Sequence, residues 1–168
     1  MATNQSTATA ESKGIEIILS REFDAPVDLL WKAWTETEQI EKYWKPGEGF
    51  DVEIKENDFR VGGKWLFNMI GPDKQVYPAT GIFGEIHSQK KIVTSDEFGD
   101  GTSQPEGAPT GVIVTVLFDD LGNNRSKLTL EIKHKSIEDR KKHEEMGVIA
   151  GWNTIFDNLA IHLATLQK

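Results

Sequence analysis

The last part of the chain has the clearest pattern of apolar and polar positions. From Val148 onward, large apolar residues recur three and four positions apart, which places them on one stripe of a helix. Val148 and Ile155 widen this stripe on one flank. Because the stripe must be covered, the rest of the chain has to supply a large apolar surface. The stripe consists of Ile149, Trp152, Phe156, Leu159, Leu163 and Leu166.

Upstream, apolar and polar residues alternate with a period of two, which is typical of half-buried strands. Short runs of turn residues, such as Gly71-Pro72-Asp73, separate the strands. The segment from Gly99 to Gly111 is rich in Gly, Pro, Ser and Thr and predicts a loop long enough to act as a lid. The predicted strands cover residues 15–23, 50–54, 65–69, 77–86, 91–98, 112–118 and 128–132.

Two short helices interrupt this series after the first strand. Pro26 fits a first helical turn, and Leu30, Trp31 and Trp34 follow it as an apolar face. A second helix is predicted to end before Pro46. Consecutive hairpins form a curved antiparallel sheet, and the long C-terminal helix is apolar enough to fill its concave face. We therefore predict an α+β helix-grip fold with seven strands and a cavity between helix and sheet.

Length and composition narrow the possibilities further. A chain of 168 residues is long enough for one core, so we predict a mobile polar tail over residues 1–13 and one domain over 14–168. A net charge of -8 disfavours nucleic acid as a partner. The chain has no Cys, no apolar run of membrane-spanning length and no export signal. We expect a cytoplasmic monomer or weak homodimer that does not insert into membranes.

Several local motifs, met in order along the chain, resemble those of a known family. They match proteins similar to the activator of the heat-shock protein 90 ATPase, within the START-like (SRPBCC) superfamily of polyketide cyclases and birch-allergen-like proteins. The resemblance runs from about Ile15 to Leu166 and implies the same helix-grip fold. It implies no single chemistry, because the superfamily includes lipid binders, hormone receptors, cyclases and co-chaperone domains. The motifs include Phe23-Asp24-Ala25-Pro26, Trp34-Thr35, Gly62-Gly63-Lys64-Trp65, Asp96-Glu97-Phe98, Met146-Gly147 and Gly151-Trp152.

The function favoured by these patterns is binding of a small, largely apolar molecule such as a lipid or polyketide. Large apolar and aromatic residues are in excess on the two faces that must oppose each other, and one amide, Asn153, lies at the edge of the helical stripe. We expect neither a cofactor nor a metal ion. The predicted ligand-binding residues are Trp44, Trp65, Phe67, Met69, Ile82, Met146, Ile149, Trp152, Asn153 and Phe156.

Two alternatives stay open. A cyclase, dehydratase or hydrolase would need a pocket carboxylate as general base, for which Glu145 and Asp96 are the candidates. Glu145 faces the cavity only if the helix runs without a break through Gly147. The run beginning at His143 lacks the second His of a zinc-protease helix, so it predicts no zinc site.

The other alternative is contact with a chaperone as a co-chaperone-like regulator, although the outer face of the sheet has the mixed charge of an ordinary surface.

Overall fold

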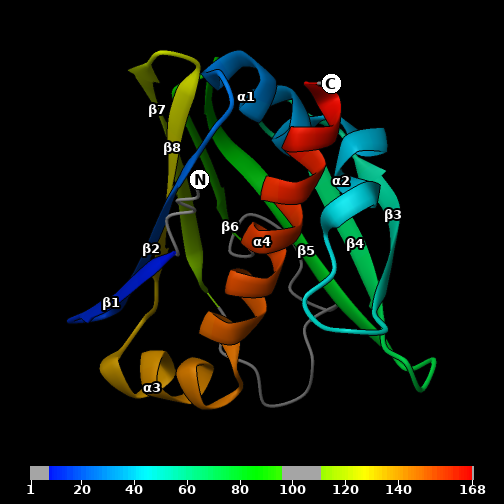
Figure 1. Ribbon diagram of the computed structural model, residues 1–168. Coiled ribbons are helices and arrows are strands. Elements are labelled where there is room, and N and C mark those ends of the chain that lie inside the picture. Colours follow the sequence, from blue (N-terminus) through cyan, green and yellow to red (C-terminus); the bar gives the residue numbers. More distant parts are fainter. Residues whose placement is uncertain (1–7, 96–110, 168) are drawn as a thin grey trace.

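The protein folds as a curved antiparallel sheet wrapped around its C-terminal helix (Figure 1). The structure, a computed structural model, describes residues 8–95 and 111–167. Within these residues the strand order is β1-β2-β8-β7-β6-β5-β4-β3, and every neighbouring pair is antiparallel. The strands are β1 (Thr9–Lys13), β2 (Glu16–Phe23), β3 (Asp51–Asn57), β4 (Lys64–Ile70), β5 (Val76–His87), β6 (Lys91–Ser95), β7 (Ile113–Gly122) and β8 (Arg125–Lys133). The helices are α1 (Val27–Thr35), α2 (Thr37–Tyr43), α3 (Ile137–Glu145) and α4 (Val148–Leu166).

The predicted α+β helix-grip fold is confirmed, with eight described strands instead of seven. The additional strand is β1, which lies in the segment expected to be a mobile tail, so that prediction is wrong for Thr9–Lys13. All five of its residues are exposed, as their polar composition predicted. The strand forms because its backbone pairs with the edge of β2, which needs no apolar side chain.

Irregular pairing on one side of the sheet contributes to its curvature. The register shifts between Ile54 and Glu56 in β3 and between Phe83 and Glu85 in β5. A bulge bends its strand and increases the local twist. The side of the sheet that carries β3 to β6 therefore turns around α4 (Figure 1).

The long C-terminal helix supplies much of the core. Phe156, Leu159 and Leu163 are buried against the sheet, whereas Ile161 on the opposite side is exposed. None of the described helices combines the length and the hydropathy needed to cross a membrane. The core residues of β2 and β8 that belong to the same cluster are Ile17, Leu19, Phe23, Leu128, Leu130 and Ile132.

A break separates α3 from α4. Gly147 has a φ of 87°, a left-handed conformation that glycine adopts without strain. Helix α3 therefore leaves the direction of α4 and packs near the β1–β2 hairpin (Figure 1). Its first turn is capped, since the Ser136 side chain accepts a hydrogen bond from the backbone N–H of Asp139 at 3.1 Å. The two helices meet at the edge of the candidate site.

Candidate ligand-binding cavity

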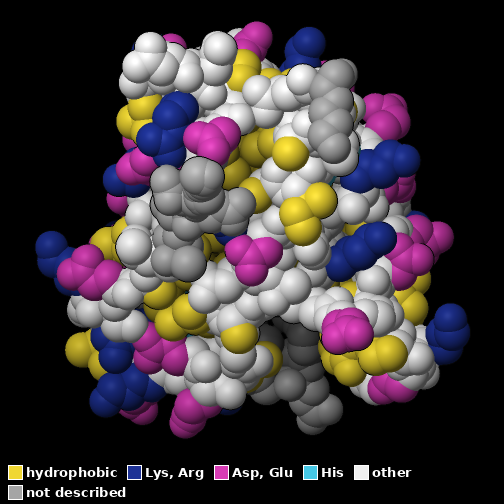
Figure 2. Space-filling view, viewed as in Figure 1, with side chains coloured by type: hydrophobic (Ala, Val, Ile, Leu, Met, Phe, Trp, Pro, Cys, Tyr) yellow, Lys and Arg dark blue, Asp and Glu magenta, His cyan; other side chains and the backbone are white. Residues whose placement is uncertain are grey.

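A cavity of about 410 Å³ lies between the N-terminal half of α4 and the sheet. Its volume falls within the roughly 300–1,000 Å³ of small-molecule sites. Helix α4 contributes Val148, Gly151, Trp152 and Ile155, which share one flank of the helix at spacings of three and four. Met146 is 52% exposed and also lines the cavity, so it marks a mouth. Figure 2 shows the surface hollowed beside the lower end of α4.

The rest of the cavity wall comes from the sheet and from the segment after α2. Pro46 and Phe50 belong to that segment, and Phe50 packs against Tyr77 of β5 with ring centroids 6.0 Å apart. Most of these side chains are apolar or aromatic. The sheet residues that line the cavity are Trp65, Met69, Tyr77, Ala79, Thr80, Thr94, Ser95, Val114 and Ile132.

A second, smaller cavity of about 100 Å³ adjoins the first and shares aromatic side chains with it. Trp44 makes edge-on contacts with Phe67 and Trp152, each with ring centroids 5.2 Å apart. Trp34 stacks on Trp152 at 6.0 Å. Trp44, Trp65 and Trp152 line both cavities, so their rings form part of the wall of each.

The polar groups on the wall are few and mostly engaged within the protein. The Thr80 hydroxyl donates to the backbone carbonyl of Trp65 at 2.7 Å, and the Trp65 indole N–H donates to the Thr94 hydroxyl at 2.5 Å. Among the described residues, no Lys, Arg, Asp or Glu lines either cavity. Such a wall favours a neutral ligand, because a charged one would lose its hydration without gaining a partner.

One titratable residue of α3, His143, also lines the large cavity. Burial, and secondarily the neighbouring His134, lower the pKa of His143 from 6.5 to about 4. At neutral pH its imidazole is therefore uncharged, which is consistent with the neutral wall around it.

The predicted ligand-binding residues divide into two groups. Some of them line a cavity, as expected from their aromatic or thioether side chains. Phe67 reaches only the smaller space. Those that line the large cavity are Trp44, Trp65, Met69, Met146 and Trp152.

The other four predicted ligand-binding residues line neither cavity. Phe156 is fully buried in the core, where its ring lies 5.9 Å from that of Trp152. Ile149 packs against the core from the other side of the α4 stripe. Ile82 lies between Gly81 and Phe83, which are both buried, so its own side chain points to the other face of the sheet. The bulge after Phe83 breaks the alternation that would have put Ile82 and Ile86 on the same face. Asn153 also lies outside both walls, and its Oδ1 is buried without a hydrogen-bond partner among the described residues.

The two candidate carboxylates fare differently. Glu145 is exposed and lines neither cavity, because the break at Gly147 turns the end of α3 away from the α4 stripe. The condition under which Glu145 would face the cavity, a helix continuous through Gly147, is therefore not met. Asp96 lies outside the described residues, as does nearly all of the predicted loop from Gly99 to Gly111.

Sequence reasoning missed several residues that line the cavity. Gly151 was noted only as part of a motif, although a glycine on the apolar flank of a helix is a signal for open space or close approach. His143 was considered only as part of an incomplete zinc motif, and its contact with His134 depends on how α3 packs. Pro46, Phe50 and Tyr77 come from turns and strand ends, whose positions no periodicity predicts.

The sheet, the helix it surrounds and the apolar cavity between them define a START-like helix-grip protein. Over residues 24–164 the chain matches the family described as "Activator of Hsp90 ATPase homolog 1-like protein", and it belongs to that family. A comparison with curated proteins found no match.

Solved structures of similar fold come from several bacteria. A protein from Arthrobacter aurescens is 25% identical, with a TM-score of 0.82 over 94% of this chain and 91% of its own. A protein from Nitrosomonas europaea is also 25% identical, with a TM-score of 0.78 over 94% of this chain and 99% of its own. An AHSA1-like protein from Aeromonas hydrophila is 17% identical, with a TM-score of 0.66 over 89% of this chain and 94% of its own. This last likeness concerns the fold alone.

Proposed function

We propose that the protein binds a small, uncharged and largely apolar molecule in the cavity beneath α4. The observation that carries this proposal is the cavity of about 410 Å³ with its wall of aromatic, aliphatic and Met side chains. A protein interior is normally packed with few voids larger than a water molecule, so a space of this size needs an explanation. Burial of a ligand there would be favoured by about 25 cal/mol for each Å² of apolar surface removed from water.

Catalysis is supported less well than binding. Of the two candidate carboxylates, Glu145 is exposed and Asp96 lies outside the described residues, and the titratable groups on the described wall are His143 and Tyr77. A histidine whose pKa lies near 4 is a poor general base at neutral pH, because the best catalytic pKa lies near the working pH. The described wall is therefore better suited to holding a molecule than to removing a proton from it.

Two measurements test the proposal. Native mass spectrometry of gently purified protein should reveal a bound molecule, and a panel of lipids and aromatic polyketides should quench tryptophan fluorescence. Quenching is a sensitive readout here, because Trp44, Trp65 and Trp152 all line the cavity. Absence of any bound mass together with absence of quenching across the panel would refute the proposal.

A pair of variants separates cavity binding from binding to the surface. Gly151 lines the cavity, and a Cβ added there meets only the Pro46 Cβ, at 3.7 Å. Gly151→Leu therefore fills the cavity in a position that leucine tolerates in a helix, and it should weaken binding by about tenfold or more. The matched control is Ala150→Leu, one residue earlier and exposed, which should bind as the wild type does. Equal loss in both variants would contradict binding in the cavity.

The family's description supplies a second candidate, contact with a chaperone ATPase. Such contact would use an outer surface rather than the cavity. A pull-down with the chaperone's middle domain, followed by an ATPase assay over several protein concentrations, distinguishes the two. Saturable stimulation that survives Gly151→Leu would favour the chaperone role.

A further inference from the structure

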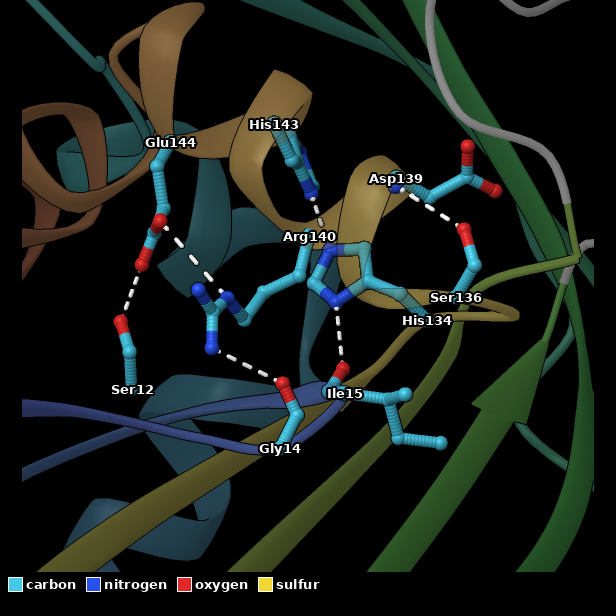
Figure 3. A network of polar contacts seen from close by, with 9 residues as sticks. All are labelled: Ser12, Gly14, Ile15, His134, Ser136, Asp139, Arg140, His143 and Glu144. Carbon is cyan, nitrogen blue, oxygen red and sulfur yellow. Dashed lines mark hydrogen bonds and ion pairs between the residues drawn. The ribbon is translucent and has the colours of Figure 1, made fainter.

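Two hydrogen-bonded histidines, His134 and His143, lie next to the turn of the β1–β2 hairpin (Figure 3). His134 follows β8 and is only 2% exposed. Its Nδ1 lies 2.9 Å from the backbone carbonyl oxygen of Ile15, and its Nε2 lies 2.9 Å from Nδ1 of His143. His143 in turn lines the large cavity, so the pair runs from a buried carbonyl to the ligand space.

The contact between His134 and the carbonyl oxygen of Ile15 determines which nitrogens of the two histidines donate and which accept. A carbonyl oxygen only accepts, so Nδ1 of His134 must carry a hydrogen. In an imidazole that carries its one hydrogen on Nδ1, Nε2 is an acceptor. The Nδ1 of His143 must then donate to it. This leaves Nε2 of His143 with a free lone pair and no hydrogen-bond partner among the described residues.

The His143 ring is held in place by the contacts of α3 with the hairpin (Figure 3). Arg140 donates to the carbonyl oxygen of Gly14 at 2.8 Å, and the Ser12 hydroxyl donates to the carboxylate of Glu144. Both contacts lie within one turn of His143. An acceptor that is fixed before the ligand arrives loses little entropy when the ligand binds.

We propose that Nε2 of His143 is a hydrogen-bond acceptor for the ligand, and that the cavity selects apolar molecules that carry a neutral O–H group, such as a phenol or an enol. His134 is the positioning residue that fixes the tautomer of His143 through its own bond to Ile15. This inference rests on the proposed binding function and adds the chemical class of the ligand. The uncharged wall excludes the corresponding anion, and His143 distinguishes the alcohol from the hydrocarbon.

A pair of probes of nearly equal shape tests the selection. 2-Naphthol carries an O–H group and is neutral at pH 7, and 2-methylnaphthalene carries a methyl group in its place. Titrations followed by the tryptophan indole N–H signals in NMR give both affinities. The wild type should bind the naphthol about three- to tenfold more tightly, as expected for one net hydrogen bond.

Three variants assign the preference to His143. His143→Leu should remove the preference, His143→Gln should restore part of it because an amide oxygen can accept, and the exposed control His87→Leu should leave it unchanged. If wild type and His143→Leu bind both probes equally well, the inference fails and the binding function stands. If the wild type binds neither probe but binds other members of the panel, the inference fails and the binding function stands; if it binds nothing in the panel, both fail.

A measurement on the wild type alone tests the tautomers without any variant. Long-range nitrogen–proton NMR spectra distinguish protonated from unprotonated imidazole nitrogens. The expected result is a proton on Nδ1 of both His134 and His143, with a further shift of the His143 Nε2 signal when 2-naphthol is added. A proton on Nε2 of His143, or a charged His134, would overturn the inference.

Discussion

The position of Trp65 in the cavity wall depends on the absence of a side chain at Gly81. The two residues are directly opposite each other in β4 and β5, and the indole ring covers the glycine, an arrangement known for cross-strand pairs of aromatic residues and glycine. A Cβ added to Gly81 would lie 2.8 Å from Nε1 of Trp65 and 2.9 Å from each of two ring carbons. Gly81→Ala therefore forces the ring to move.

The size of the effect follows from these distances. Carbon atoms in contact are normally about 3.5–4.0 Å apart, so the ring must shift by roughly 0.6 Å or more. Such overpacking costs about 1–3 kcal/mol, and loss of the bond from Trp65 to Thr94 adds about 1 kcal/mol. The lower entropy of the unfolded chain offsets about 0.4–1 kcal/mol of this. We expect Gly81→Ala to lower the free energy of unfolding by about 1–3 kcal/mol.

Urea unfolding followed by fluorescence measures this effect. With a slope of about 2 kcal/mol per molar urea, the midpoint should fall by about 0.5–1.5 M. The matched control is Gly151→Ala, the same chemical change where the new Cβ meets only Pro46 at 3.7 Å. That variant should be about 0.5–1 kcal/mol more stable than the wild type, because alanine is the better helix former. A midpoint for Gly81→Ala at or above that of the wild type would refute the reasoning.

Three further predictions concern polar groups. Asp157→Ala should lower the free energy of unfolding in urea by about 1–3 kcal/mol, because it leaves the 5% exposed side chain of Arg21 without its ion-pair partner. Arg21→Met removes the buried charge itself and should therefore lower it less. Ser136→Ala should cost about 1 kcal/mol and increase hydrogen exchange in α3, because it removes the N-cap; unchanged exchange would argue against the cap. Because the pKa of His143 is about 4 when folded and 6.5 when unfolded, the unfolded state binds the proton more tightly. The free energy of unfolding should therefore fall by up to about 3 kcal/mol between pH 6.5 and pH 4, and His143→Leu should reduce this fall.

The parts of the fold that depend on local pattern could be predicted from the sequence. The alternation of Val114, Val116 and Phe118 identified a strand, which in the structure extends to Gly122 and turns at Asn123-Asn124. Both asparagines have positive φ values, 54° and 59°, as a tight hairpin requires. Such features need no knowledge of distant residues, because a periodicity or a turn residue acts within a few positions.

The parts that depended on tertiary contacts could not be predicted. Strand β1 buries no side chain, and its hairpin with β2 is stabilised because β2 is itself held in the sheet by β8. The bulge between Phe83 and Glu85 changes which side of β5 faces inward; Gly84 within it is typical of a bulge, but it does not tell which residues face inward on either side. This bulge explains an error at the candidate site. Ile82 was predicted to line the cavity on the assumption that inward and outward positions alternate without a break along β5.

Two glycines explain why α4 and the sheet leave space between them. Gly81 admits the Trp65 indole, whose ring contributes to the walls of both cavities. Gly151 leaves the facing flank of α4 without a side chain beside Trp152. A larger residue at Gly151 would occupy the space directly, and a larger residue at Gly81 would move the aromatic wall. The two substitutions should therefore have different effects. Gly151→Leu should weaken ligand binding without lowering the free energy of unfolding, whereas Gly81→Ala should lower the free energy of unfolding. Loss of stability in both variants would mean that the space beneath α4 is not open to a side chain.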